Sequence, residues 1–148
     1  TAQSQLYLGQ VSLTNLDING KARYGTMNGE LLEMLNNCGR VLWSGVSSMN
    51  GAQSVTPSLK MSETLNGWIL IWSAFSSRAA SNSRFHFSFI PKYYAQLFSG
   101  SGITCVLFGS GDGVGQKYVY TSDTAITGND INVSGMAAGY VLRAVVAW

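Results

Sequence analysis

Short runs of alternating apolar and polar residues fill the chain from residue 41 onward and predict β-strands. Residues 84–92 alternate most regularly, because Phe85, Phe87 and Phe89 share one face of an extended chain and His86 falls on the other. We predict strands at residues 41–46, 54–59, 67–75, 84–92, 104–108, 117–121 and 141–147. Short strands separated by turn residues are typical of an all-β, antiparallel β-sandwich or jelly-roll-like domain.

Residues 67–75 differ from the other predicted strands because nearly every position is apolar, Trp68 and Trp72 included. Such a run predicts a strand that is buried on both faces. Asn66 and Gly67 form a turn signal before it. Pro57 removes a backbone donor from the preceding predicted strand, which indicates an edge strand or a bulge.

The first 40 residues form a separate region with a different pattern. Residues 6–8 and 11–18 alternate as short strands do, and Asn19-Gly20 follows them as a turn. Residues 28–39 predict a short amphipathic helix, which is too short to be stable alone and must pack on a neighbour. We therefore divide the chain into a linker or oligomerisation segment, residues 1–40, and a β-sandwich binding domain, residues 41–148.

Composition narrows the classes of partner. Only 11% of the residues are charged, and the nine basic residues are scattered, so no stripe is available to neutralise several phosphates. We expect neither nucleic-acid binding nor membrane insertion, because the apolar runs are far shorter than a spanning helix of about 20 residues. A surface rich in hydroxyls and amides suits both a virion or extracellular protein and sugar recognition. Because the chain begins with Thr1, we expect it to be part of a longer protein.

Residues that could support catalysis or bind a metal do not form a recognisable constellation. His86 is the only histidine, and no nucleophile elbow accompanies it. The glycine-rich run at residues 109–115 lacks the Gly-Lys-Ser/Thr ending of a phosphate-binding loop and precedes a predicted strand, so we interpret it as a hairpin loop. Cys38 and Cys105 fit no metal-ligand spacing, and we do not favour a disulfide between them.

The acidic residues also form no recognisable catalytic arrangement. Asp112, Asp123 and Asp130 cluster late in the sequence, where a glycosidase pair is conceivable, but all three fall in polar turns. Aspartate in a turn commonly accepts hydrogen bonds from nearby backbone N–H groups. We therefore predict a protein that is not an enzyme and that uses no metal and no cofactor.

Aromatic side chains with a polar atom are the better candidates for ligand contact, because flat rings can stack on sugars. Most of them belong to the predicted core or to subunit contacts. From chemistry and expected exposure, the predicted glycan-binding residues are Trp43, His86, Tyr93, Tyr94 and Asp112. For His86 the plainer interpretation, a histidine on the polar face of a strand, remains open beside direct ligand contact.

Several motifs occur in an order that resembles a known family. They are Val41-Leu42-Trp43-Ser44-Gly45, residues 66–73, Phe87-Ser88-Phe89-Ile90-Pro91-Lys92, Lys117-Tyr118-Val119-Tyr120, residues 124–130 and residues 141–145. Together they cover residues 41–148, which resemble the C-terminal receptor-binding or baseplate domain of tail proteins from tailed phages and prophages of Gram-positive bacteria. The resemblance carries over no catalytic motif.

The resemblance implies a virion protein at the distal tail, facing outward, that contacts other tail or baseplate proteins and forms a homotrimer. It implies a role in adsorption, by recognition of a cell-wall polysaccharide or teichoic acid of the host. The alternative is a structural baseplate module that makes only protein–protein contacts.

Overall fold

The computed structural model describes residues 32–109 and 113–148. The strands predicted upstream of residue 20, the first four residues of the predicted helix and Asp112 lie outside this range. Residues 32–37 are helical, within the predicted helix. Contacts along the chain set residues 37–148 apart as one compact unit, and the description below concerns that unit.

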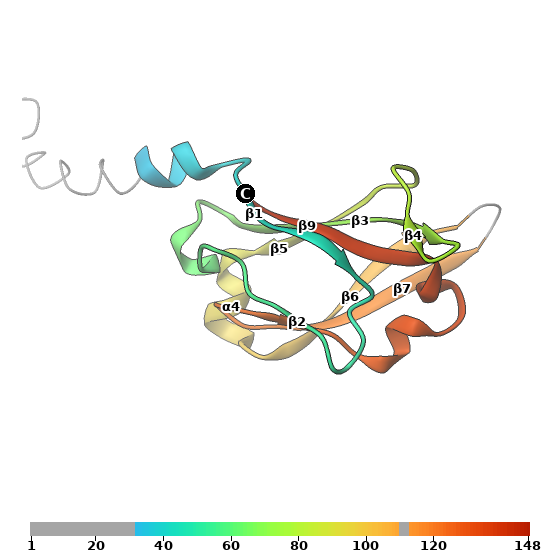
Figure 1. Cartoon of the computed structure of the whole chain (residues 1–148). Coiled ribbons are helices and arrows are strands. Elements are labelled where there is room, and N and C mark those ends of the chain that lie inside the picture. The colour runs from blue at the N-terminus through green and yellow to red at the C-terminus, as the bar shows by residue number, and fades with distance from the viewer. Residues whose placement is uncertain (1–31, 110–112) are drawn as a thin grey trace, which may run out of the picture. The chain divides into compact units, whose positions relative to one another are not determined.

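The unit is a sandwich of two antiparallel sheets, which confirms the predicted all-β class (Figure 1). The first sheet runs β1 (Val41–Ser47), β9 (Tyr140–Ala147), β3 (Gly67–Ser76), with β5 (His86–Pro91) paired to β3 and β4 (Ala79–Ala80) forming a short hairpin on its end. The second runs β2 (Ser54–Val55), β8 (Ile126–Thr127), β7 (Val114–Thr121), β6 (Ser101–Phe108).

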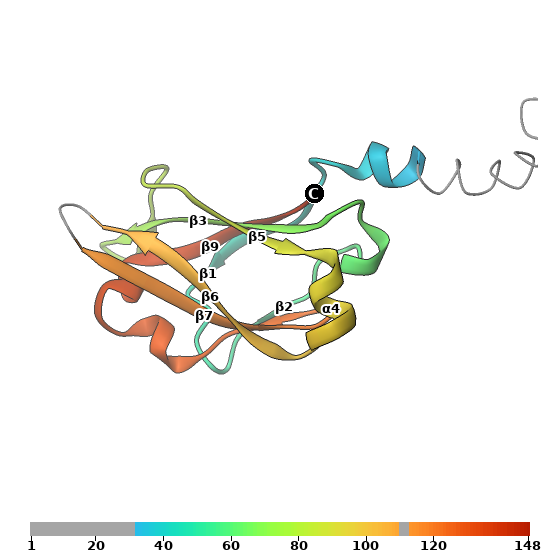
Figure 2. The same ribbon diagram turned by 180° about the vertical axis from the view of Figure 1, so that it is seen from behind.

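Short helices connect the strands. Helix α4 (Lys92–Phe98) carries the chain from β5 in one sheet to β6 in the other, as Figure 2 shows from behind. Three single-turn helices lie in the loops: η3 (Met61–Glu63), η4 (Asp130–Val133) and η5 (Gly135–Gly139). The strand predicted at residues 54–59 is paired over two residues only, and the strand predicted at residues 84–92 ends at Pro91, where α4 begins.

The core lies between the sheets. On β3, Trp68, Leu70 and Trp72 are fully buried and meet Leu107 and Val119 of the second sheet in one apolar cluster. Apolar side chains at every second position of paired strands supply most of the burial that stabilises such a sandwich. Cys105 is buried in this cluster, and its burial raises the pKa of its thiol. Cys38 is exposed, and both cysteines are free.

The prediction that β3 is buried on both faces is wrong for the face that points away from the core. Ile69 and Ile71 remain partly exposed on the outer face of the first sheet. Register places Phe89 beside Ile69 and Phe87 beside Ile71, and the two phenylalanines are 56% and 57% exposed. Within residues 32–109 and 113–148 of the structure, the side chains on this face stay open to solvent.

Two buried polar residues tie β7 to the loops beneath the second sheet. Lys117 is fully buried, and its Nζ donates to the carbonyl oxygens of Ser48 (3.1 Å) and Asn132 (2.9 Å). The Asn132 side chain accepts from the Tyr118 N–H (2.7 Å) and donates to the carbonyl oxygens of Tyr118 (2.8 Å) and Met49 (2.7 Å). The amide therefore pairs with β7 much as a neighbouring strand would.

Candidate functional site

The predicted site residues do not come together. Trp43 lies on β1, partly buried against the core, and His86 lies on β5 at the opposite edge of the same sheet, with β9 and β3 between them. Tyr93 and Tyr94 lie on α4, where Tyr93 is exposed and Tyr94 is partly buried. Of the two adjacent tyrosines only Tyr93 is exposed, and the segment that carries them is a helix.

His86 links the two sheets. Its Nε2 accepts the Phe108 N–H of β6 at 2.9 Å, so this nitrogen carries no proton. The proton therefore sits on Nδ1, which lies 3.0 Å from the Arg84 carbonyl oxygen and donates to it. The ring packs edge-on to Tyr140, with centroids 5.2 Å apart. Both ring nitrogens are engaged within the protein, which favours a positioning role for His86 over direct ligand contact.

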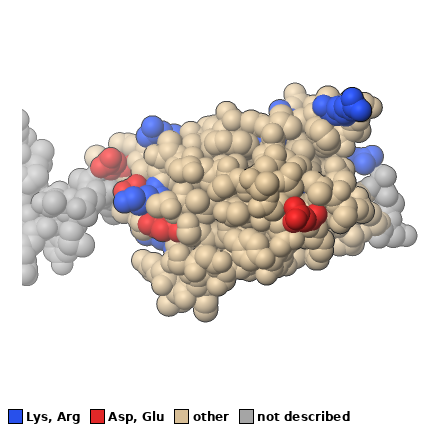
Figure 3. Space-filling model, turned by 60° about the horizontal axis from the view of Figure 1, so that its bottom comes forward, with Lys and Arg blue, Asp and Glu red and all other residues tan. Residues whose placement is uncertain are grey.

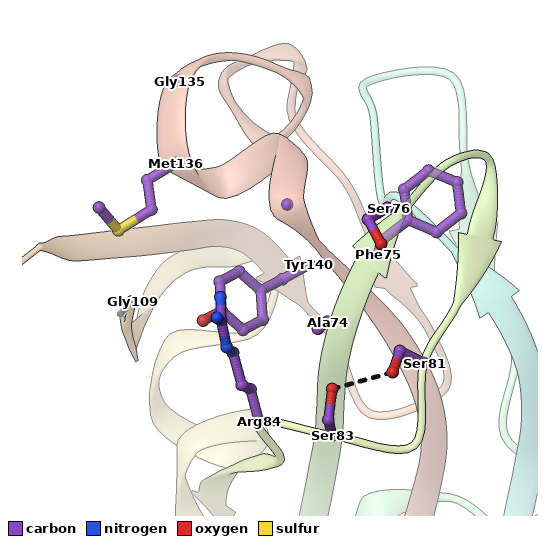
Figure 4. A pocket seen from close by; sticks show the side chains of 11 residues that line it. Ala74, Phe75, Ser76, Ser81, Ser83, Arg84, Gly109, Gly135, Met136 and Tyr140 are labelled. Atoms are coloured by element: carbon purple, nitrogen blue, oxygen red, sulfur yellow. Dashed lines mark hydrogen bonds between the residues drawn. The ribbon is translucent and has the colours of Figure 1, made fainter. Parts of the chain in front are cut away.

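A pocket of about 480 Å³ opens beside His86, at the end of the sandwich where β4 lies (Figure 4). Segments that are far apart in the sequence surround it. Its lining residues are Ala74, Phe75, Ser76, Ser81, Ser83, Arg84, Gly109, Gly135, Met136, Gly139 and Tyr140. The described residues of the lining combine serine hydroxyls, one guanidinium group and apolar side chains, and none of them carries a carboxylate.

Among the described residues of this lining, Arg84 is the only one with a full charge. Its backbone adopts φ +52°, in the left-handed region that an arginine rarely occupies. The His86 Nδ1 bond to the Arg84 carbonyl holds this conformation, and Figure 4 shows Arg84 and Tyr140 among the residues that line the pocket. In the described part of the chain, no carboxylate lies within salt-bridge distance of Arg84.

The serine-bearing segment next to Arg84 is held in place from two sides. The Ala74 N–H donates to the Ser83 carbonyl at 3.1 Å, and the Ser81 N–H donates to the Ala74 carbonyl at 2.8 Å. The Ser81 and Ser83 hydroxyls lie 2.9 Å apart, a bond drawn in Figure 4. Behind them, Arg143 Nη1 donates to the side-chain oxygen of Asn82 at 3.3 Å. Hydroxyls fixed in this way bind a ligand with little loss of conformational entropy.

Tyr140 and Met136 form the floor and one wall. Tyr140 is 2% exposed, and its hydroxyl donates to the Phe108 carbonyl at 2.7 Å, which closes the pocket between the sheets. Met136 packs against the glycines that flank the hairpin loop, since a Cβ on Gly109 or Gly115 would approach its side chain to 3.0 Å. The glycine-rich run therefore makes room for this wall.

The two described aspartates of the late cluster accept hydrogen bonds from loops that are distant in the sequence, and not from N–H groups of their own turns. Asp123 accepts the Ser62 N–H at 2.7 Å and the Ser62 hydroxyl at 2.8 Å. Asp130 accepts the Gly51 N–H at 2.9 Å. Neither lines the pocket. Among the described residues, no group of three or more His, Cys, Asp or Glu side chains is placed to hold a metal ion.

The sequence pattern indicated His86 but not the residues that line the pocket beside it. The signal that could have found them is the run Ser76-Ser77-Arg78 to Ser83-Arg84, a hydroxyl-rich segment with two arginines and no acid. Its position against Gly109 and Met136 depends on how the two sheets pack.

Comparisons with protein-family models, with curated proteins and with solved structures give no match for this chain. In the described part, no helix is long and apolar enough to cross a membrane.

Proposed function

We propose that this chain is a receptor-binding domain of a phage tail or baseplate, which recognises a glycan on the host cell surface during adsorption. The observation that carries the proposal is the pocket beside His86, which offers fixed serine hydroxyls, an arginine and apolar side chains. Concave sites of this kind, mostly apolar with a few placed polar groups, are typical of small-ligand recognition.

The surrounding surface supports a glycan as the ligand. Charged side chains are few on the face seen in Figure 3 and lie mostly towards its ends. Hydroxyl and amide groups therefore provide much of the polar surface, and they exchange hydrogen bonds with sugar hydroxyls as readily as with water. The order of the motifs in residues 41–148 and their resemblance to phage tail domains supply the biological setting.

Arg84→Ala should weaken binding to Gram-positive cell-wall fragments by about tenfold or more, because a hydrogen bond to a charged group contributes about 1.5 kcal/mol or more. Binding is measured by co-sedimentation with walls from a panel of Gram-positive strains. Arg78→Ala is the matched control, because Arg78 is exposed on the adjacent turn, carries the same charge and does not line the pocket. Equal losses in both variants would refute a specific role for Arg84. Wild-type protein that is retained by no wall would refute the proposed function.

A structural baseplate module is the second candidate, and the outer face of the first sheet favours it. Val41, Val146, Ile69 and Phe89 form a continuous row across all four long strands of this sheet. Trp148 extends the row by packing against Phe89, with ring centroids 5.2 Å apart. An exposed apolar patch of this size usually marks a protein–protein contact. Since the row carries no charge, the same face of three copies can pack together around a common three-fold axis, and we propose a homotrimer built through it.

Phe87→Ser combined with Phe89→Ser should convert the assembly to monomers in light scattering at micromolar concentration. The reason is that each exposed phenylalanine contributes about 2 kcal/mol of burial at an interface. Val106→Ser, on the exposed face of the other sheet, is the control and should leave the mass unchanged. A wild-type monomer would contradict the trimer. Deletion of the domain separates the two functions, because a purely structural module is required for particle assembly and a receptor-binding domain only for adsorption.

A further inference from the structure

A second cluster of aromatic residues lies on the outer face of the other sheet, which consists of β2, β8, β7 and β6. Tyr118 and Tyr120 of β7 both point outward, because the alternate residues Lys117, Val119 and Thr121 are buried. Register pairs Tyr118 with Thr104 and Tyr120 with Gly102 of β6. None of these outward-facing residues lines the pocket beside His86.

Gly102 allows the Tyr118 ring to lean across β6. A Cβ on Gly102 would overlap the hydroxyl and adjacent ring atoms of Tyr118. The ring therefore occupies the space in which a side chain at position 102 would stand, and it lies along the sheet. Any larger residue at this position would force Tyr118 away from the strand.

Tyr120 stands at a right angle to this ring. The two centroids are 5.4 Å apart and the ring planes meet at 89°. Tyr120 is held upright by Asn129, whose side-chain N–H donates to the Tyr120 hydroxyl at 3.1 Å. The pair forms a corner with one ring as floor and the other as wall, and we call it the tyrosine corner.

Hydroxyl and amide groups without formal charge surround the tyrosine corner. The Tyr94 hydroxyl donates to the Gly102 carbonyl at 3.2 Å, and burial together with the nearby Tyr118 hydroxyl raises the pKa of Tyr94, so it stays neutral. The Ser54 and Thr127 hydroxyls lie 3.3 Å apart next to Tyr120, which pairs with Thr127. An uncharged rim around two ring faces matches a ligand that is itself uncharged, with an apolar face and hydroxyls at its edge.

We propose that the tyrosine corner is a second glycan subsite, which binds one neutral pyranose by stacking its C–H face on Tyr118 and abutting Tyr120. The inference rests on the proposed function, since it names a second contact for the same class of ligand. Gly102 and Phe108 are six residues apart on β6, so the corner lies on the order of 20 Å from the pocket. Two subsites at this spacing suit a polymer that spans several sugar units, and simultaneous contact raises its apparent affinity.

The test uses the whole chain labelled with ¹⁵N and titrated with glucose, galactose, rhamnose and N-acetylglucosamine at millimolar concentration. The amide signals of Gly102, Tyr118, Tyr120 and Asn129 should shift with at least one of these sugars. Tyr120→Ala should weaken that binding by about tenfold, equivalent to about 1.4 kcal/mol. Tyr120→Phe, which keeps the ring, should retain most of the binding.

A control variant separates the corner from the rest of the surface. Gln116→Ala, exposed on the same face of β7, should bind like the wild type. The proposal is overturned if no sugar shifts the corner amides, if only pocket amides such as Ser83 shift, or if Tyr120→Ala binds normally. Shifts at the corner in a protein that no cell wall retains would support the subsite and refute the proposed function.

Discussion

Asn132→Ala is expected to lower the free energy of unfolding by about 4 kcal/mol, because it leaves the Tyr118 N–H and carbonyl unpaired, at about 1–3 kcal/mol each, and removes a third bond. That third bond goes to the Met49 carbonyl, which still accepts the Asn129 N–H. Asn132 is fully buried in η4. Its side chain binds the N–H and the carbonyl of Tyr118 and the carbonyl of Met49, with all three distances at 2.8 Å or less. Alanine can replace none of these bonds, and the site is closed to water.

Urea denaturation measures this loss, with an unchanged dependence on denaturant as the sign that the same transition is compared. Asn132→Asp should be at least as destabilising, since a carboxylate would face the Met49 and Tyr118 carbonyl oxygens. Ser134→Ala is the control, because Ser134 is exposed just beyond the same helical turn and donates only to the Ile131 carbonyl. If Asn132→Ala loses less than about 1 kcal/mol, the amide does not hold β7 in the way described.

The same amide connects stability to the tyrosine corner. Asn132 fixes the backbone of Tyr118 from the loop side, and Gly102 gives the Tyr118 ring room on the strand side. A variant at position 132 should therefore disturb sugar binding at the corner even where the fold survives. Variants at Tyr120, which leave this backbone pairing intact, are the cleaner test of the corner itself.

The alternation of apolar and polar residues predicted where the long strands lie. It did not predict which face of β5 points into the core. The pattern in residues 84–92 defines two faces, but it does not say which one turns inward. In the structure the face with His86 and Ser88 turns inward, because Trp72 Nε1 donates to the Ser88 hydroxyl at 3.1 Å and the Phe108 N–H donates to His86. Once these polar groups have partners between the sheets, the phenylalanines are left outside. Such partners come from distant strands and are invisible in a local pattern.

Helix α4 escaped prediction for a related reason. Its residues include Tyr93, Tyr94 and Phe98, which favour strands, and Pro91 at its N-cap supplies no side-chain hydrogen bond. Seven residues are too few for a helix to form on local propensity. Burial of Ala95 and the bond from Lys92 Nζ to the Thr64 carbonyl, at 2.9 Å, hold it in place. Both contacts depend on the packed sandwich.

The pocket could not be predicted from the sequence, because its lining comes from four separate segments of the chain. Ala74 and Arg84 belong to the first sheet and its β4 turn, Gly109 follows β6, and Met136 lies in η5. Their meeting depends on the crossing of the two sheets, which alternation does not determine. What the sequence did indicate was their chemistry: many hydroxyls, scattered arginines and few acids.

Lys117→Met should remove a rise in stability with pH that the wild-type protein shows between about pH 8 and about pH 10.4, the ordinary lysine pKa. Lys117 is fully buried, with no carboxylate within salt-bridge distance in the described residues, and burial lowers the pKa of its ammonium group to about 8. Its bonds to two carbonyls and the Trp72 ring, whose centroid is 5.9 Å from Nζ, limit this loss of charge but do not abolish it.

The sign follows from proton binding. Between the two pKa values the unfolded chain keeps the proton and the folded protein has released it, so raising the pH favours the folded state. The stability of the wild type relative to Lys117→Met should grow by about 3 kcal/mol across this window and stay constant outside it. Urea denaturation of both proteins at several pH values gives this difference directly, since the other titrating groups are common to both and cancel. Stability at neutral pH alone is less informative, because methionine removes the buried charge but leaves the Ser48 and Asn132 carbonyls without a donor. Parallel pH profiles for the two proteins would show that Lys117 keeps its proton in the folded state.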